Sequence, residues 1–231
     1  MSLIENKIPE DIFRQIRFQV NARHNIYKNT TISEALRYDP LQLIQVQVDN
    51  ITKMMIQGRE LYQKYPPGSV VGGDWDLESK PFADSIYYRS LKMRFVDESP
   101  WEETPLYKSA VNRNPGNHYH GCETKEDVLN RLSDLESIYH SISQNGYLTQ
   151  RELNRSNKDL HPENHRGFNL PEKEEVLINI GRDGDLIMDN GRHRLAMVKL
   201  LDIDEIPVLV VGRHRRWWEQ GNRVADIEGN G

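Results

Sequence analysis

Cysteine and long apolar runs are the scarcest features of this 231-residue sequence. Its single cysteine, Cys122, cannot form an internal disulfide. No window approaches the roughly 18 consecutive apolar residues that a membrane-spanning helix requires. The first residues also lack the apolar stretch of a signal peptide. We therefore expect a cytoplasmic protein with no membrane partner.

Neither sign of charge dominates, since 30 lysines and arginines face 35 aspartates and glutamates, for a net charge of −5. This balance argues against a chain that coats nucleic acid along its whole surface. The sequence also lacks the GxxxxGK, GxSxG and HExxH motifs. The stretch GGDWD is not a dinucleotide fingerprint, because the third glycine and a following helix signal are missing. Any site for a polyanion is expected to be confined to a small basic patch of the surface.

The first half of the chain has mixed local patterns. Apolar spacing predicts helices over residues 9–23, 52–65 and 82–95, and alternation predicts a strand within 41–51. A short apolar run at 69–71 is expected to end in a loop that carries Asp74 and Asp76. Residues 99–107 and 112–122 are expected to be loops, and so is the polar segment 154–174.

The second half has clearer signals. Thr124 and Asp127 form the pattern of a capping box, and the helix that follows is expected to end at Asn145-Gly146. The patterns predict a hairpin over 174–191, a helix over 192–203 and a buried strand over 205–212. We expect an α/β (α+β) fold, a small mixed sheet with packed helices. The expected parts are a mainly helical extension (1–123), a core (124–212) and a basic, aromatic tail (213–231), which could also form one continuous domain.

The stretch MDNGRHRLAM places a glycine, two arginines and a histidine between the hairpin and the helix. Backbone N–H groups and the positive end of a helix dipole favour phosphate at such a position, and arginine adds bidentate hydrogen bonds. The other interpretation is that Asp189 or Asn190 caps the helix while the arginines are solvated. We favour phosphate binding by the turn residues Asp189, Asn190, Gly191, Arg192, His193 and Arg194.

The order of these elements resembles the ParB and sulfiredoxin-like superfamily over roughly residues 124–212. The matching pieces are LESIYHSISQNGYLTQ, VLINIGRDGDLIMDNGRHRLAMVKLL and IPVLVV. The resemblance implies a phosphate-binding turn at Gly191, His193 and Arg194, with Asn190 where the family usually has aspartate. Arg192 stands where a sulfiredoxin carries its cysteine, so that chemistry is not expected. The superfamily also includes CTP-binding clamps, free serine kinases and proteins labelled nuclease-like.

A phosphotransferase needs a carboxylate to align the nucleophile and usually Mg²⁺ to bridge phosphates. We expect Asp74, Asp76 and His193 as catalytic residues, with Asp74 and Asp76 as the Mg²⁺ ligands. The other interpretation is that the two aspartates cap a turn around a buried Trp75. The function expected is a nucleotide-dependent phosphotransferase or NTPase that takes a nucleotide triphosphate or diphosphate and acts on a small molecule.

Three further hypotheses concern other parts of the chain. A ParB-like DNA-binding or nuclease-like protein, with nucleotide as a switch, would use the tail, although no convincing helix-turn-helix follows the core. Histidines and Cys122 could supply zinc ligands, but their spacing matches no known zinc motif. Aromatic side chains of the first half could instead line a small-molecule pocket. The tail residues are Arg213, Arg215, Arg216, Trp217, Trp218 and Arg223, the zinc candidates His118, His120, Cys122, His161 and His165, and the aromatics Trp75, Tyr87, Tyr88 and Trp101.

Overall fold

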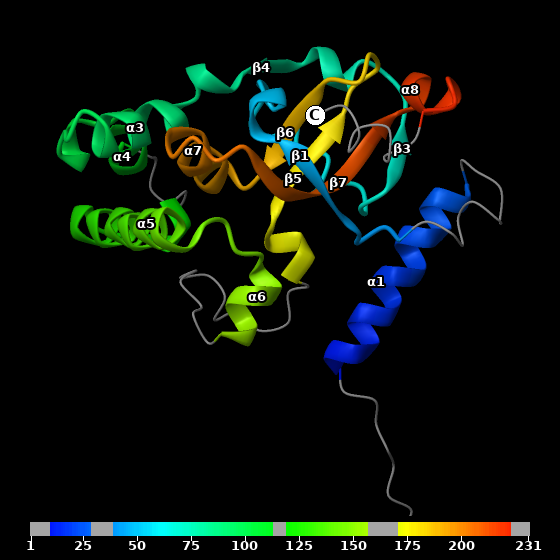
Figure 1. Cartoon of the computed structure of the whole chain (residues 1–231), viewed down its shortest axis with the longest axis horizontal. Helices are drawn as coiled ribbons and strands as arrows, with labels where there is room; N and C mark the ends of the chain where they lie inside the picture. Colours follow the sequence, from blue (N-terminus) through cyan, green and yellow to red (C-terminus); the bar gives the residue numbers. More distant parts are fainter. Residues whose placement is uncertain (1–9, 29–38, 113–118, 157–170, 223–231) are drawn as a thin grey trace, which may run out of the picture.

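The computed structural model describes residues 10–28, 39–112, 119–156 and 171–222. Its described part is a mixed α/β fold in which one seven-stranded sheet packs against helices (Figure 1). The helices are α1 (Glu10–Tyr27), α3 (Ile86–Phe95), α4 (Pro105–Val111), α5 (Lys125–Asn145), α6 (Gln150–Arg155), α7 (Arg192–Leu200) and α8 (Arg215–Glu219). The strands are β1 (Leu43–Gln47), β2 (Lys53–Met55), β3 (Ser69–Val71), β4 (Ser79–Pro81), β5 (Val176–Ile180), β6 (Leu186–Asn190) and β7 (Glu205–His214).

The sheet joins both halves of the chain. Its strand order is β1-β7-β5-β6-β2-β4, and β3 pairs with the last residues of β7 beyond β1. The β5–β6 hairpin is antiparallel, whereas β5 runs parallel to β7 and β2 runs parallel to β6. The segment 43–81 therefore contributes four strands to the same sheet as the hairpin, in addition to the helices of the first half.

Both faces of the central strands are buried. Val176, Ile178 and Ile180 of β5 belong to the large core that α3, α4, α5 and α7 cover, whereas Leu177 belongs to a smaller cluster on the other face. Loop residues, among them Leu61, cover that second face. This double burial explains why the sequences of β5 and β7 are continuous apolar runs rather than alternating patterns.

Several local predictions are confirmed by the structure. Thr124 and Asp127 form the capping box at the start of α5, and Gly146 follows its last turn with a φ of 73°. The hairpin, α7 and β7 lie where the sequence places them. The helices expected over 9–23 and 82–95 correspond to α1 and α3.

Two local predictions are wrong. Residues 52–65 are not helical, because Met54 and Met55 are drawn into β2 between β6 and β4, and Gly58 adopts a φ of 85° that ends any regular run. The segment 99–107 is not simply a loop either, since Thr104 caps the start of α4 by accepting a hydrogen bond from the Tyr107 amide. The loop expected over 154–174 lies largely outside the described residues.

Among the described residues, no helix has both the length and the apolar content to cross a bilayer.

Candidate functional site

Gly191 makes the turn from β6 into α7. It occupies the N-cap position with a φ of 86° and a ψ of 28°, and a Cβ atom there would lie 2.9 Å from the Val176 Cα. Only glycine meets both demands without strain. Because glycine has no side chain to cap the helix, the first-turn N–H groups are directed to the space in front of α7. Neither Asp189 nor Asn190 is the cap, contrary to the alternative interpretation of this turn.

A pocket of about 150 Å³ opens in front of α7. The wall of the pocket combines side chains from both halves of the chain. Three arginines and two glutamates line it, and the positive end of the α7 dipole lies in its wall. The lining residues are Tyr87, Tyr119, His120, Arg131, Leu135, Ile138, Glu174, Glu175, Asn190, Gly191, Arg192, His193 and Arg194.

Arg192 is held at the base of this pocket by an ion pair. Its Nη2 donates to the Glu60 carboxylate, which is itself buried, and its Nη1 lies 3.3 Å from the Tyr87 hydroxyl. The guanidinium also lies over the Tyr87 ring, 5.3 Å from its centroid. Tyr87 meets the His193 ring edge to face, at 5.1 Å between ring centroids. These contacts fix the orientation of the first turn of α7.

Arg194 is buried in a second ion pair. Its Nη1 lies 3.2 Å from Glu175 Oε2 and 3.1 Å from the Tyr147 hydroxyl. Tyr147 donates to the same carboxylate oxygen at 2.9 Å, and the Gln150 amide donates to the other at 2.6 Å. Burial raises the pKa of Glu175 although Arg194 opposes that shift. Neither turn arginine is simply solvated, since Arg192 and Arg194 each pair with a buried carboxylate.

Asp189 lies on β6 with its side chain under the loop at Leu61. Its Oδ2 accepts hydrogen bonds from the amides of Leu61 (3.0 Å) and Tyr62 (3.2 Å) and from Asn179 Nδ2 (2.6 Å). Burial raises the pKa of Asp189 to about 6, against the effect of these hydrogen bonds. Asp189 therefore holds the Glu60–Tyr62 loop in place and does not line the pocket, whereas Asn190 does.

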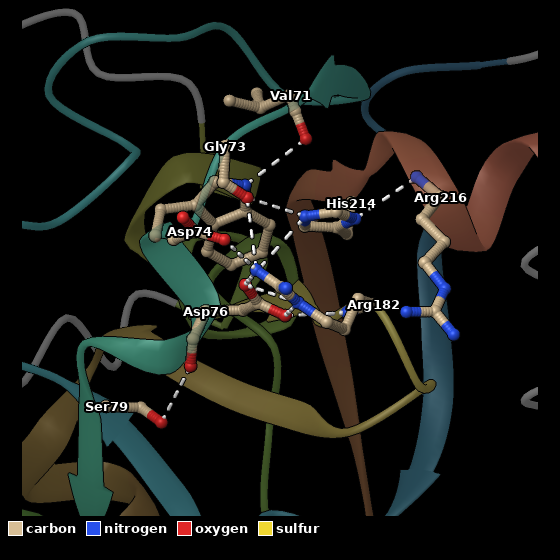
Figure 2. Close-up of polar contacts among 9 residues, drawn as sticks. Val71, Gly73, Asp74, Asp76, Ser79, Arg182, His214 and Arg216 are labelled. Carbon is tan, nitrogen blue, oxygen red and sulfur yellow. Dashed lines mark hydrogen bonds and ion pairs between the residues drawn. The ribbon is translucent and has the colours of Figure 1, made fainter.

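Asp74 and Asp76 gather around Arg182 in the hairpin turn (Figure 2). Arg182 Nε donates to Asp76 Oδ2 at 2.9 Å, its Nη2 to Asp76 Oδ1 at 2.8 Å and to Asp74 Oδ1 at 2.7 Å. His214 Nδ1 accepts from the Arg216 amide, so its Nε2 carries the proton and donates to the Gly73 carbonyl at 2.8 Å. Burial alone would raise the pKa of Asp76, but the hydrogen bonds from Arg182 hold that pKa below its ordinary value.

The Arg182 cluster and the α7 pocket lie at opposite ends of the hairpin. Arg182 follows β5, Gly191 follows β6, and a five-residue strand spans about 17 Å. The structure therefore does not bring Asp74 and Asp76 to the phosphate turn as expected for catalysis or Mg²⁺ binding. Both carboxylates instead form ion pairs with Arg182.

The zinc and aromatic-pocket hypotheses gain no support from the described residues. His118, His161 and His165 lie outside them, and within them no group of three or more His, Cys, Asp or Glu side chains is placed to hold a metal ion. The four aromatic side chains do not form one pocket. Tyr87 lines the pocket at α7 and Trp75 a different one of about 170 Å³, while Tyr88 packs edge to face on Phe82 and Trp101 is buried in the core.

The basic tail is only partly a surface. Arg213 is buried in β7, donates to the Gly68 carbonyl at 2.9 Å and lies over the Trp218 ring, and its burial lowers its pKa to about 9. Trp217 is buried against the core, and Arg215 and Arg216 are exposed on α8. Arg223 lies outside the described residues. Arg213 and Trp217, two of the six tail residues expected to contact nucleic acid, are thus interior.

Sequence reasoning missed several residues of the α7 site. Glu60, Arg131 and Glu174 come from three separate segments, and each reaches the site only through the tertiary fold, whereas Tyr87 was named only as an aromatic candidate for a small-molecule pocket. For these residues, one local sequence signal was present: two adjacent carboxylates, Glu174 and Glu175, directly before an apolar strand could have been taken as candidate site residues.

No protein-family model matches this chain, and neither a curated protein nor a solved structure matches it. The resemblance to the ParB and sulfiredoxin-like superfamily therefore remains a prediction from its motifs.

Proposed function

We propose that this chain binds a nucleotide through its phosphates in the pocket in front of α7, as a ParB-like protein would. One observation carries the proposal, namely that the glycine-capped N-terminus of α7 opens into a pocket walled by Arg131, Arg192 and His193. Helix N–H groups, the dipole and cationic side chains all stabilise a phosphate in such a position. The pocket volume suits the phosphate groups, with the rest of the ligand extending outward.

We further propose that the bound nucleotide is used in phosphotransfer or hydrolysis with a small-molecule acceptor or water. The chemistry needs a carboxylate at the phosphates, and Glu174 and Glu175 both line the pocket. Glu175 is buried, whereas Glu174 is only half-buried in the wall of the pocket, so we assign this role to Glu174. It would accept the proton of the attacking hydroxyl while the bond from the transferred phosphorus to the leaving nucleotide breaks.

Mg²⁺ fits this arrangement better than it fits Asp74 and Asp76. Mg²⁺ usually binds one or two carboxylates together with substrate phosphates. Glu174 and the Asn190 side chain offer oxygen ligands in the wall of the pocket, whereas Asp74 and Asp76 already form ion pairs with Arg182. When bound, Mg²⁺ would supply charge neutralisation at the phosphates.

The test is nucleotide turnover by the full chain with ATP, CTP and GTP in Mg²⁺. We expect the Glu174→Gln variant to lose at least about a hundredfold in rate while it still binds nucleotide, the range for loss of a general base. Asp74→Asn is the matched control and should retain full turnover. Full activity of Glu174→Gln, or loss of activity in Asp74→Asn alone, would contradict the assignment. Binding without any turnover would leave a nucleotide-binding module rather than an enzyme.

A further inference from the structure

A cavity of about 170 Å³, which we name the Trp75 pocket, shares no lining residue with the pocket in front of α7. It lies beside the smaller apolar cluster of the sheet, because Leu61 of that cluster lines it and Trp75 packs against the cluster. Asp74, in its wall, pairs with Arg182 at the hairpin turn, the end of the hairpin away from α7. The lining residues are Met55, Arg59, Leu61, Lys64, Tyr65, Val71, Gly72, Asp74, Trp75 and Glu78.

The inner part of the Trp75 pocket is apolar and aromatic. Leu61 and Val71 are buried, and Tyr65 and Trp75 add two aromatic rings. The indole N–H of Trp75 already donates to the Val71 carbonyl at 3.2 Å, and its ring lies 5.8 Å from the His214 ring, centroid to centroid. These contacts fix the ring of Trp75 and leave it only an apolar surface to offer a ligand. An apolar cavity of about 150 Å³ binds benzene, so the volume of the Trp75 pocket suits a single aromatic ring.

The charged side chains of the Trp75 pocket leave one cation available. Arg59 pairs with Glu78 at 3.3 Å, and Asp74 pairs with Arg182 at 2.7 Å. Lys64 is exposed, and its ammonium group forms no hydrogen bond or ion pair within the part of the chain that the structure describes. A ligand with one negative charge would therefore gain an ion pair with Lys64. The two carboxylates in the same wall disfavour a doubly charged group such as phosphate.

We propose that the Trp75 pocket binds a small aromatic carboxylate, a molecule with one aromatic ring and a short chain that ends in a carboxyl group. The ring packs against Trp75 and Tyr65, where aromatic rings attract one another beyond the area that they bury. The carboxylate accepts a charge-assisted hydrogen bond from Lys64. An apolar body with one placed polar group is the usual pattern of small-molecule recognition. This site does not depend on phosphate binding at α7, because the two pockets have no residue in common.

The test follows the indole N–H resonances of the ¹⁵N-labelled full chain by nuclear magnetic resonance, with 3-phenylpropionate as the probe. The Trp75 resonance is identified by its loss in Trp75→Phe. The probe should shift this resonance with a Kd of about 1 mM or lower, as expected for a ligand of this size. The resonances of Trp101 and Trp217, which are buried in the larger core, should stay in place.

Lys64→Gln separates the charge from the apolar contact. It should raise the Kd of 3-phenylpropionate by about fivefold or more and leave that of the uncharged 3-phenylpropan-1-ol unchanged. Lys125→Gln, at an exposed lysine of α5, is the matched control and should bind the probe as the wild type does. Because both lysines are exposed, neither change should disturb the fold, which the amide resonances report.

Three results would overturn the proposal. The first is a Trp75 resonance that does not move at about 10 mM probe, well above the expected Kd. The second is equal affinity for the acid and the alcohol, or an unchanged Kd of the acid in Lys64→Gln. The third is displacement of the probe by an equal concentration of inorganic phosphate, which would make the pocket an anion site rather than a site for an aromatic acid.

Discussion

Arg192 and Arg194 stand two positions apart, yet each side chain is held by a different buried carboxylate. Arg192 pairs with Glu60 at the base of the pocket, and Arg194 pairs with Glu175 beside Tyr147. Removing one partner of a buried ion pair leaves an uncompensated charge, which commonly costs several kcal/mol. Arg194→Ala is therefore a poor probe of ligand binding, because it would destabilise the fold. His193 is the better probe in this turn.

Asp189 gives a prediction about pH at the residue scale. Its pKa in the folded chain is about 6, above the ordinary aspartate value of 3.8, because burial disfavours the charged form. The folded state thus binds more protons than the unfolded state between these values, so Asp189 lowers stability as the pH rises from about 4 to about 6. The shift corresponds to about 3 kcal/mol.

The measurement is urea unfolding of the wild type and of Asp189→Asn at several pH values. The amide has no charge to bury and keeps one oxygen acceptor for the Leu61 and Tyr62 amides. We expect the stability of the wild type to fall relative to Asp189→Asn between about pH 4 and about pH 6, and to run parallel to it above about pH 7. A difference that is constant across this range, or that grows in favour of the wild type as the pH rises, would refute the assignment.

At the scale of elements, α7 depends on the backbone of Gly191. Gly191→Ala would force a Cβ atom to within 2.9 Å of the Val176 Cα at a φ of 86°. We expect this change to reduce the free energy of unfolding by about 2 kcal/mol or more, from strain in the left-handed region together with the clash. Chemical denaturation measures the loss.

Gly146→Ala is the control for this substitution. Gly146 also has a positive φ, of 73°, but a Cβ atom there would have nothing within 4 Å. It should therefore cost clearly less than Gly191→Ala. Equal losses for the two variants would mean that the close approach of Gly191 to β5 does not constrain α7.

The elements that the sequence predicts correctly carry their signals within a few residues. The capping box at Thr124, the turn between β5 and β6 and the apolar face of α7 each depend on short-range chemistry. Strand β2 is different, because its three residues form a strand between β4 and the residues Ile187 and Met188 far along the chain. The pattern over 52–65 favoured a helix, and no local feature could reveal that pairing.

In the whole molecule, some residues of the candidate site have local sequence signals, whereas others reach it only through contacts between distant segments. The turn residues Asn190, Gly191 and His193 are predicted from local sequence, and they do line one pocket. The partners of the site are not predictable, because Arg192 meets Glu60 across 132 positions and Arg182 meets Asp76 across 106. Two neighbouring carboxylates near a strand end were a reasonable hypothesis for catalysis. They contact the hairpin at its turn, the end away from the α7 pocket.

The proposed function depends on phosphate binding in front of α7. Thermal unfolding of the wild type, His193→Ala and Arg216→Ala with ATP, ADP, CTP and GTP, each with and without Mg²⁺, tests it most directly. At about 100 times Kd, a nucleotide should raise the Tm of the wild type and of the exposed α8 control Arg216→Ala by about 5 °C or more, and that of His193→Ala far less. No rise with any of these nucleotides, or an equal rise in His193→Ala, would contradict phosphate binding in front of α7.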